Sequence, residues 1–409
     1  MRIRVAHETN SLQGELNITG SKSESNRLLI LRALYPTLDL QNLSNSDDTQ
    51  VMQQALSSNE EVIDIHHAGT AMRFLTAYFA VQEGREVVLT GSSRMQERPI
   101  RLLVDALRSM GADISYEKEE GFPPLRIRGK KMHVAEVSVQ ANISSQYISA
   151  LMLIAPSLPD GLEIHLKGQV TSVPYISMTL QLLQQVGIAG SFEDNRICIE
   201  PQKELPAKTV NIESDWSSAS YFYSLAAIGG YAVLKLSNYK KNSLQGDSCL
   251  AGIYKQFGVT TEYGENTILL KRDEPKKPRK LVEDLRNSPD IAQTIAVTCL
   301  AAGVECELTG LHTLKIKETD RLVALKTEIE KFGAKVDITH DKLKLKPVAE
   351  LKKEVSVATY HDHRMAMAFA PLALRVPLWV EDAMVVSKSY PSFWEDLKTL
   401  NFFLQREEA

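Results

Sequence analysis

Basic side chains recur in short polar segments of this chain, each at or just before the start of a helix-like run. The segment 20–27 carries Lys22 and Arg27, Arg98 precedes an amphipathic pattern, and Arg364 lies in the last such segment. A helix N-terminus offers unpaired N–H groups and a partial positive charge, so it readily binds anions. Arginine adds a fork of donors that can grip a carboxylate or phosphate with two bonds. The pattern therefore predicts a site for phosphates and carboxylates.

Two acidic residues beside such cations are candidates for proton transfer. Asp290 stands at the head of an apolar helical pattern, and residues 317–321 read Lys-Glu-Thr-Asp-Arg. If this segment opens a helix, Lys317, Glu318 and Arg321 can share one face. A positioned carboxyl group can then act as a general acid or base. Taken alone, each feature has a simpler explanation, a helix cap for Asp290 and an exposed charge pair for the segment.

Several other site patterns are missing from the sequence. The segment 20–27 lacks the G-x-x-x-x-G-K-[ST] spacing of a P-loop, and no G-x-G-x-x-G supports a dinucleotide site. His361 and His363 are two residues apart without an H-E-x-x-H motif, which argues against a zinc site. Ser144 and Ser145 lack the G-x-S-x-G elbow of a serine hydrolase, so capping is their expected role.

Length and composition predict a globular protein of two or three domains. The chain has 409 residues, of which 44% are hydrophobic and 24% charged. Its 47 basic and 51 acidic residues nearly balance, which argues against a polycation that coats nucleic acid or anionic lipid. No apolar run approaches the roughly 18 residues of a membrane span, and the N-terminus lacks a signal-peptide pattern. Four scattered cysteines fit a reducing compartment, so we expect a soluble cytoplasmic protein.

An internal repeat orders these segments. Six polar clusters each lead into a run of small and apolar residues, at intervals of 46, 76, 72, 73 and 73 residues. We take as anchors Ser23, Gly69, Ser145, Ser217, Asp290 and His363. The spacing indicates one period of about 73 residues with a shortened first unit. All six runs begin with polar residues, so several helix N-termini are expected to converge as anion sites.

A second helix lies inside each full unit. Four amphipathic patterns with apolar residues at i, i+3, i+4 and i+7 end in glycines that suit the C′ position, namely Gly111, Gly187, Gly258 and Gly333. Each unit then reads strand, buried helix, strand, amphipathic helix and strand pair. Six such units predict two lobes of three with a break near Glu213, and the opening strand, residues 2–18, could pair with either lobe.

Ten of these segments, in this order, resemble the 5-enolpyruvylshikimate-3-phosphate synthases, also called 3-phosphoshikimate 1-carboxyvinyltransferases. They run from residue 20 to residue 391 and read Gly-Ser-Lys-Ser-x-Ser-Asn-Arg, Ser-Asp-Asp-Thr, Ala-Gly-Thr-Ala-Met-Arg, Arg-Met-x-Glu-Arg-Pro-Ile, Ser-Ser-Gln, Pro-Tyr-Ile, Gln-Gly-Asp, Pro-Asp-Ile-Ala, Lys-Glu-Thr-Asp-Arg and Asp-His-Arg-Met-Ala-Met. The resemblance implies an α/β fold, a two-lobed inside-out α/β barrel of six βαβαββ-type units with the first truncated. It places residues 21–212 in an N-terminal lobe that mainly binds shikimate 3-phosphate. Residues 1–20 and 213–409 would form a C-terminal lobe with the acid–base and phosphoenolpyruvate-binding residues.

The resemblance also implies an activity. The enolpyruvyl group of phosphoenolpyruvate would pass to the 5-hydroxyl of shikimate 3-phosphate by addition and elimination through a tetrahedral intermediate, in aromatic amino acid biosynthesis. No metal or organic cofactor is expected, nor a nucleic acid or membrane partner, and the chain is expected to be a monomer. Asp290 is the candidate base, Glu318 the candidate acid, and Lys22 would stabilise the charge of the intermediate and the leaving phosphate.

The same resemblance assigns binding residues to each substrate. Shikimate 3-phosphate is expected at Lys22, Ser23, Arg27, Ser144, Ser145, Gln146, Ser172, Tyr175, Asp290, Thr313 and Lys317. Phosphoenolpyruvate is expected at Lys22, Gly69, Arg98, Gln146, Arg321, Arg364 and Lys388.

The chain departs from the family pattern at a few positions. His66 and His67 stand where Gly-Asn is usual, and Thr313 and His361 replace asparagines. A sister family that acts on UDP-N-acetylglucosamine shares the fold and the enolpyruvyl chemistry, but it typically has a loop cysteine near the position of Arg94, and this loop contains none. The alternative of another class is a non-catalytic anion-binding relative, which would bind both ligands without releasing phosphate.

Overall fold

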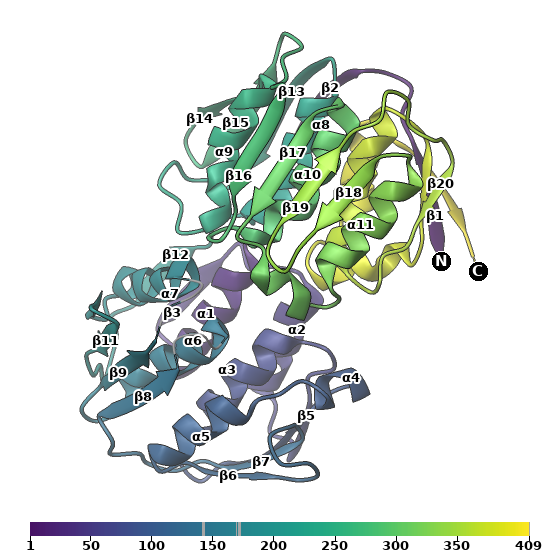
Figure 1. Cartoon of the computed structure of the whole chain (residues 1–409). Coiled ribbons are helices and arrows are strands. Elements are labelled where there is room, and N and C mark those ends of the chain that lie inside the picture. The colour runs from purple at the N-terminus through teal and green to yellow at the C-terminus, as the bar shows by residue number, and fades with distance from the viewer. Residues whose placement is uncertain (141–143, 169, 171–172, 409) are drawn as a thin grey trace. The chain divides into compact units, whose positions relative to one another are not determined.

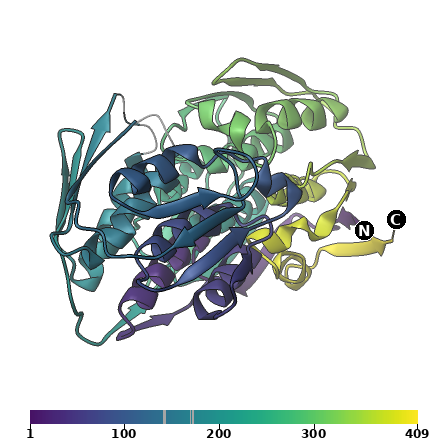
Figure 2. The ribbon, with the colours of Figure 1, turned by 90° about the horizontal axis from the view of Figure 1, so that it is seen from below.

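The computed structural model describes residues 1–140, 144–168, 170 and 173–408. The chain forms two compact units, an N-terminal unit of Gly20–Ile212 and a C-terminal unit of Met1–Thr19 with Glu213–Ala409 (Figure 1). Among the described residues, each unit encloses three buried helices, and its sheets lie outside them (Figures 1 and 2). The predicted inside-out α/β arrangement is therefore confirmed.

The N-terminal unit is built around α1 (Lys22–Leu34), α3 (Gly69–Ala80) and α6 (Ser145–Ile154). One sheet has the order β4-β5-β7-β6, from β4 (Val62–Asp64), β5 (Glu86–Thr90), β7 (Leu125–Arg128) and β6 (Asp113–Tyr116). A second has the order β10-β11-β9-β8, from β10 (Gly190–Glu193), β11 (Arg196–Ile199), β9 (Leu162–Lys167) and β8 (Glu136–Gln140). A two-stranded sheet joins β12 (Lys208–Asn211) to β3 (Leu38–Gln41). The other helices are α2 (Asp47–Ser57), α4 (Ser93–Gln96), α5 (Arg101–Ser109), η1 (Ala155–Ser157) and α7 (Val173–Val186).

The C-terminal unit is built around α8 (Trp216–Ile228), α10 (Ala292–Ala302) and α12 (His363–Phe369). One sheet has the order β14-β15-β13-β2, from β14 (Thr260–Tyr263), β15 (Thr267–Arg272), β13 (Tyr231–Ser237) and β2 (Ser11–Leu16). The next has the order β16-β17-β19-β18, from β16 (Lys280–Asp284), β17 (Glu305–Thr309), β19 (Leu343–Lys346) and β18 (Lys335–Ile338). The last has the order β20-β21-β1-β22, from β20 (Val355–Val357), β21 (Leu378–Val380), β1 (Arg2–Ala6) and β22 (Phe403–Glu407).

Shorter helices complete the C-terminal unit. They are η2 (Gly246–Cys249), α9 (Leu250–Tyr254), η3 (Lys255–Phe257), η4 (Pro289–Ile291), η5 (His312–Ile316), α11 (Arg321–Lys331), η6 (Ala370–Leu374), η7 (Ala383–Lys388) and α13 (Phe393–Thr399). No helix in the described part of the chain is both long enough and apolar enough to span a bilayer.

Each four-stranded sheet follows the same pairing rule. In each of them one edge strand is parallel to its neighbour, as β4 is to β5 from Val62↔Val88 to Asp64↔Thr90, and the remaining pairs are antiparallel. A parallel pair needs a crossover connection, and here the buried helix supplies it between β4 and β5. The two-stranded sheet keeps only the parallel pair, β12 with β3, so the predicted truncation of the first unit is confirmed.

Two strands from the start of the chain pair with strands of the C-terminal unit that lie far along the sequence. The predicted single strand 2–18 is two strands, β1 and β2, which belong to different sheets of the C-terminal unit. β2 pairs in parallel with β13, and β1 lies between β21 and β22. β12, which precedes α8 in the chain, pairs instead with β3 of the first repeat. Each unit is thus closed by a strand that is distant in sequence.

The central helices α8 and α10 carry mostly small or apolar side chains all round, which suits a helix enclosed by protein. Every residue of α8 is buried. Its hydroxyl groups pair with those of α10, since Thr298 Oγ1 donates to Ser224 Oγ at 2.7 Å and the hydroxyls of Ser220 and Thr294 lie 3.0 Å apart. These pairs satisfy polar groups that would otherwise be costly to bury.

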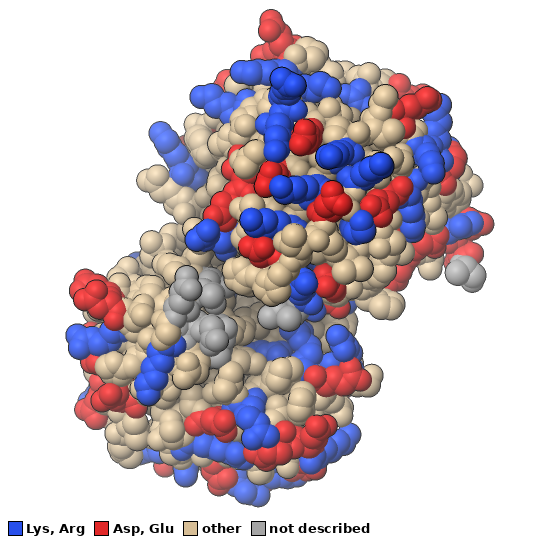
Figure 3. Space-filling model, viewed as in Figure 1, with Lys and Arg blue, Asp and Glu red and all other residues tan. Residues whose placement is uncertain are grey.

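The outer face of a sheet in the C-terminal unit is charged but mixed in sign. Lys and Arg alternate with Asp and Glu over β16 to β19 (Figure 3). Lys280 Nζ lies 3.0 Å from Glu307 Oε2, and Lys344 Nζ lies 3.2 Å from Glu307 Oε1. Such exposed pairs contribute little to stability but keep the face soluble and without an excess of one sign.

The predicted glycine ends of the amphipathic helices are confirmed. The four glycines have φ values of 101°, 104°, 80° and 100° at Gly111, Gly187, Gly258 and Gly333. A positive φ at the C′ position turns the chain out of the helix, and glycine adopts it without crowding a Cβ atom.

We predict that Gly333→Ala destabilises the C-terminal unit by about 1–2 kcal/mol. The position has room, because a Cβ there would meet Val348 only at an ordinary 3.8 Å, so the cost comes from the φ of 100°. Gly252, inside α9, has no described atom within 4 Å of such a Cβ. Gly252→Ala should therefore stabilise the unit by about 0.5–1 kcal/mol. Urea unfolding of both variants checks the pair, and equal shifts in the same direction would contradict it.

Candidate active site

A buried arginine lies at the centre of the charged residues in the C-terminal unit. The side chain of Arg321 is 1% exposed, and its Nε donates to Asp362 Oδ2 at 2.6 Å. Its Nη1 donates to Asp290 Oδ1 at 2.9 Å and its Nη2 to Glu318 Oε2 at 2.8 Å. Burial alone would lower the pKa of Arg321, but the charges of Asp362, Glu318 and Asp290 outweigh it and raise that pKa. One guanidinium thus joins three carboxylates.

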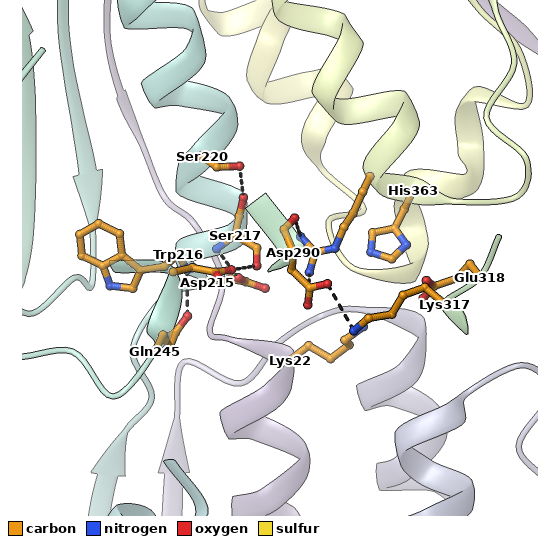
Figure 4. A network of polar contacts seen from close by, with 12 residues as sticks. Lys22, Asp215, Trp216, Ser217, Ser220, Gln245, Asp290, Lys317, Glu318 and His363 are labelled. Carbon is orange, nitrogen blue, oxygen red and sulfur yellow. Dashed lines mark hydrogen bonds and ion pairs between the residues drawn. The ribbon is translucent and has the colours of Figure 1, made fainter. Parts of the chain in front are cut away.

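Asp290, the candidate base, contacts three cations. Besides Arg321, its Oδ1 lies 3.4 Å from Lys317 Nζ, and its Oδ2 lies 3.3 Å from Arg364 Nη2. Figure 4 shows the contact between Asp290 and Lys317, with Glu318 and His363 close by. Arg364 Nη1 also donates to the carbonyl oxygen of Asp290 at 3.2 Å. Burial lowers the pKa of Arg364, but the charge of Asp290 outweighs it, so that pKa lies well above its ordinary value.

The helix expected to open at Lys317 begins later than predicted. α11 starts at Arg321, and Asp320 Oδ1 caps it by accepting from Leu322 N at 3.1 Å and Val323 N at 3.2 Å. Lys317 and Glu318 therefore do not share a helical face with Arg321, and that prediction is wrong. Residues 317–319 bend before the helix begins, and this bend still brings Lys317 to Asp290 and Glu318 to Arg321.

Two other predicted residues lie in the same unit. Lys388, at the end of η7, donates through Nζ to the carbonyl oxygen of His361 at 2.9 Å. Thr313 lies in η5, and its buried Oγ1 has no hydrogen-bond partner among the described residues. An unpaired hydroxyl in such a position can bind a ligand at no cost to an existing bond.

Asp247 and Asp362 belong to this cluster, although sequence reasoning gave neither a role. Asp247 pairs with the hydroxyl of Ser217 at the start of α8. Burial raises the pKa of Asp247 to about 7, and the charge of Asp290 adds to this, while Arg364 opposes it. Both residues lie in quoted motifs, Gln-Gly-Asp and Asp-His-Arg, which were the only signal available in the sequence.

The N-terminal unit holds a second set of predicted residues. Lys22 is the first residue of α1, and its Nζ lies 3.8 Å from Asp48 Oδ2 on α2. Ser23 follows Lys22, and its carbonyl oxygen accepts from Arg27 Nη1 at 2.8 Å. Arg27 is 3% exposed, and it also donates through Nε to Thr179 Oγ1 at 2.8 Å. Burial lowers the pKa of Arg27 to about 10, so the guanidinium remains charged at neutral pH.

Gly69, at the start of α3, lies directly against Arg98. A Cβ atom at residue 69 would be 2.6 Å from Arg98 Nη1, so a larger residue would displace the guanidinium. Arg73, which sequence reasoning missed, braces this contact by donating to Gly69 O at 3.1 Å and to Pro99 O at 3.3 Å. Burial, together with repulsion by Arg98, lowers the pKa of Arg73 to about 10.

The start of α6 contacts the start of α3. Ser144 caps α6 through Oγ, which accepts from Gln146 N at 3.4 Å, and Ser145 is the first residue of the helix. Gln146 Nε2 donates to Thr70 Oγ1 at 3.2 Å.

The two remaining predicted residues of this unit are Tyr175 and Ser172. Tyr175 lies on α7, and its carbonyl oxygen accepts from Thr179 Oγ1 at 2.8 Å. The side chain of Thr179 also binds Arg27, so Tyr175 lies one contact away from that guanidinium. Ser172, which was predicted to bind shikimate 3-phosphate, lies outside the described residues.

The unusual His66 and His67 line a hollow of about 240 Å³ in the N-terminal unit. Asp47 and Asp48 of α2 and Ala68 also line it. In the described chain, no three His, Cys, Asp or Glu side chains are grouped so that they could hold a metal ion.

The helix N-termini differ in whether they remain open to an anion. Asp215 Oδ1 accepts from Ser217 N at 2.8 Å at the start of α8, and Asp362 Oδ1 accepts from Arg364 N at 2.9 Å at the start of α12. The protein's own carboxylates occupy these two ends, so the expectation that helix ends in general form anion sites is too broad. Among described residues, no side chain caps α1 or α3, and these two ends fit the expectation.

We predict that Asp362→Ala destabilises the C-terminal unit by about 3–5 kcal/mol, because it leaves a buried guanidinium without its closest partner. Asp362 is 0% exposed. The matched control is Lys280→Ala, which removes an exposed ion pair with Glu307 and should cost less than about 1 kcal/mol. Urea unfolding checks both, and similar losses for the two variants would show that burial of the pair is not decisive.

We predict that Asp247 makes the protein less stable as the pH rises from about 4 to about 7. Its pKa is about 7 in the folded state against an ordinary 3.8, so in this range the folded state holds a proton that the unfolded state has lost. Asp247→Asn should remove this slope. The difference between its free energy of unfolding and that of the natural protein should grow in favour of the variant by about 1–3 kcal/mol from pH 5 to pH 8. The exposed Asp337→Asn is the control, and parallel pH curves for Asp247→Asn and the natural protein would refute the prediction.

Comparison with known proteins gives a consistent family. The family model described as EPSP synthase (3-phosphoshikimate 1-carboxyvinyltransferase) matches residues 53–397. A 3-phosphoshikimate 1-carboxyvinyltransferase of Bacteroides fragilis is 46% identical over 398 residues, which cover 96% of each chain. The enzyme of that name from Photobacterium profundum is 38% identical over 420 residues, covering 95% of this chain and 97% of the other. The fold is similar to that of the EPSP synthase of Acinetobacter baumannii, with a TM-score of 0.79 at 19% identity over 99% of this chain and 100% of that one.

Proposed function

Because the chain belongs to the EPSP synthase family, we propose that it transfers the enolpyruvyl group of phosphoenolpyruvate to the 5-hydroxyl of shikimate 3-phosphate and releases phosphate. The observation that carries the proposal furthest is that two candidate proton carriers, Asp290 and Glu318, share the buried guanidinium of Arg321. This places the enzyme in aromatic amino acid biosynthesis.

The two substrates bring two phosphates and two carboxylates, which need cationic partners. We propose that Lys317, Arg321, Arg364 and Lys388 of the C-terminal unit serve this need together with Lys22, Arg27 and Arg98 of the N-terminal unit. The arginines suit planar two-bond grip of such groups, and the lysines act as compact charges. Gly69 supports this role because it leaves room for Arg98, and the partnerless hydroxyl of Thr313 supports a polar contact with shikimate 3-phosphate.

The remaining predicted residues supply neutral contacts to the substrates. We propose that Ser23, Ser144, Ser145, Ser172, Gln146 and Tyr175 bind shikimate 3-phosphate, and that Gln146 also reaches phosphoenolpyruvate. Gln146 is suited to a shared role because its amide already bridges from α6 to Thr70 of α3. Arg27 is held by Thr179 and Ser23, so it would offer a fixed charge rather than a mobile one.

The chemistry requires one proton to leave the substrate and another to reach it. In the addition step, Asp290 takes the proton of the 5-hydroxyl while the oxygen of that hydroxyl bonds to C2 of phosphoenolpyruvate. Glu318 gives a proton to the methylene carbon C3. In the elimination step, the bond from C2 to the phosphate oxygen breaks, Glu318 takes a proton from C3 to restore the double bond, and the proton held by Asp290 leaves with the phosphate. Lys22 stabilises charge on the tetrahedral intermediate and on the departing phosphate.

The charge pairing of Asp290 explains how binding could be coupled to reaction. Without substrate, Arg321, Lys317 and Arg364 pair with its carboxylate. Anionic substrates that draw these cations toward themselves would weaken that pairing and make the carboxylate a better proton acceptor. Asp290 would then be basic only when the substrates are present.

We also propose that the enzyme acts as a cytoplasmic monomer without a metal or organic cofactor and without a nucleic acid or membrane partner. Its nearly balanced charge, with a formal net value of -4, supports this assignment. Gel filtration at micromolar concentration tests the monomer, and activity after dialysis against a chelator tests the absence of a metal.

We predict that the purified protein releases phosphate only when both substrates are present. Asp290→Asn and Glu318→Gln should each lower turnover about 100-fold or more, since each removes a proton-transfer group. Binding of shikimate 3-phosphate, measured by calorimetry, should change little in either variant.

Glu330→Gln is the matched control, because Glu330 lies on α11 outside the cluster. Its Oε1 is 2.9 Å from Nζ of Lys326. It should retain full turnover. Survival of turnover in both Asp290→Asn and Glu318→Gln would refute the acid–base assignment even within the right family. Binding of both substrates without phosphate release would instead indicate a non-catalytic relative.

A further inference from the structure

The segment between β20 and α12 forms a turn that bulky residues rarely adopt. Tyr360 and His361 both have a φ of 55°, and Asp362 N donates to Thr359 O at 2.9 Å to close the turn. Turns with two positive φ values at their centre usually carry Gly, Asn or Asp there. Larger side chains in this conformation crowd the backbone, so other contacts must hold it.

Glu328 of α11 holds one side of this turn. Tyr360 Oη donates to Glu328 Oε1 at 2.7 Å, and Ala358 N donates to Glu328 Oε2 at 3.0 Å. The side chain of Glu328 is 0% exposed, and Lys331 Nζ lies 2.6 Å from its Oε2. A buried carboxylate with three donors is a rigid support, because losing any of them would leave its charge less well compensated.

His361 ties the other side of the turn to both ends of η7. Its Nδ1 lies 3.0 Å from Oδ2 of Asp382, the residue that precedes η7. Its carbonyl oxygen accepts from Nζ of Lys388, the last residue of η7, at 2.9 Å. Asp382 also has a positive φ, of 44°. One residue thus spans this short helix and contacts it at its start and at its end.

We propose that the turn 359–362 positions Lys388, and that His361 and Glu328 act through this lysine without touching the substrate. The inference rests on the proposed function for the role of Lys388 in binding phosphoenolpyruvate. A flexible lysine side chain loses conformational entropy when its ammonium binds an anion. A hydrogen bond to a carbonyl oxygen already restricts the side chain and does not cancel its charge. The turn also ends at Asp362, which holds Arg321. The same segment therefore sets two cations of the predicted phosphoenolpyruvate set.

The test compares His361→Ala with the conservative His361→Asn. Alanine removes the contact with Asp382 while the strained φ remains. Because this pair is exposed, the KM for phosphoenolpyruvate should rise about 3- to 5-fold, the most that one such pair contributes. The kcat and the KM for shikimate 3-phosphate should stay within about twofold, because the proton carriers are untouched. Asparagine tolerates a positive φ and can still donate to Asp382, so His361→Asn should restore the KM to within about twofold of the natural value.

Glu354→Ala provides the matched control. Glu354 also has a φ of 55° and forms an ion pair with Arg4, yet it makes no described contact with η7. Its loss should leave all three kinetic constants unchanged. An equal rise in the KM for phosphoenolpyruvate in Glu354→Ala would reduce the effect to general destabilisation and overturn the proposal.

A second readout does not depend on activity. Trace labelling with acetic anhydride, followed by mass spectrometry, reports how accessible the amine of Lys388 is relative to the exposed Lys398. The ratio should rise severalfold in His361→Ala and in Tyr360→Phe, which loses the contact with Glu328, and should return to the natural value in His361→Asn.

The outcomes separate this inference from the proposed function. If the natural protein releases no phosphate but the labelling ratio rises as expected, the turn positions Lys388 and the proposed function fails. If the protein is active but Lys388→Met leaves the KM for phosphoenolpyruvate unchanged, the route through Lys388 is overturned. An unchanged KM or an unchanged labelling ratio in His361→Ala overturns the positioning role itself.

Discussion

The charge of one buried guanidinium constrains the C-terminal unit more than any other single interaction. Arg321 is 1% exposed, so taking its charge out of water would be prohibitive without partners. Its partners, Asp290, Glu318 and Asp362, come from η4 before α10, the bend before α11 and the cap of α12. These segments cannot move independently, because displacing any one of them leaves part of a buried charge uncompensated. The candidate catalytic groups are thus held by the same ion pairs that compensate the buried charge of Arg321.

The inside-out arrangement explains why chemistry gathers at helix starts. Sheets on the outside leave the central helices surrounded by protein, so α8 and α10 contain no charged residue and their internal hydroxyls pair with one another. The N-termini of α1 and α3 then offer N–H groups beside Lys22 and Gly69, whereas Asp215 and Asp362 close the ends of α8 and α12. Within the C-terminal unit, the proposed partners of the anionic substrates are therefore the side chains of Lys317, Arg321, Arg364 and Lys388.

Several conformations in the C-terminal unit are held by contacts rather than by local preference. Tyr360, His361 and Asp382 adopt positive φ values that their side chains disfavour. Buried Glu328 and the pair of His361 with Asp382 compensate for this. Such strained segments cluster where the position of a functional group matters more than local stability, and we propose that here the group is the ammonium of Lys388, which donates to the carbonyl oxygen of His361.

Much of the fold and of the site could be predicted from the sequence, because the signals were local or periodic. The 73-residue period, the buried helices and the glycine ends depend on residues close together in the chain, and the motifs around Lys22, Asp290 and Arg364 could be read in the same way. The start of α11 was misplaced, because charge spacing alone does not show that Asp320 caps the helix at Arg321. Asp247 and Arg73 lie in quoted motifs, but the motifs do not show what these residues contact, because the pairing of Asp247 with Ser217 and of Arg73 with Pro99 depends on the fold.

By itself, the sequence determined the number and type of repeats, the class of ligand and the candidate proton carriers. Only the tertiary structure decided that β1 and β2 close two different repeats, that β12 joins the first, and that Asp362 holds Arg321. The physical reason is that strand pairing and charge compensation act between distant segments, from 41 residues apart for Arg321 and Asp362 to 405 for Arg2 and Glu407. Their energies depend on which groups meet in space, and no local spacing along the chain encodes that.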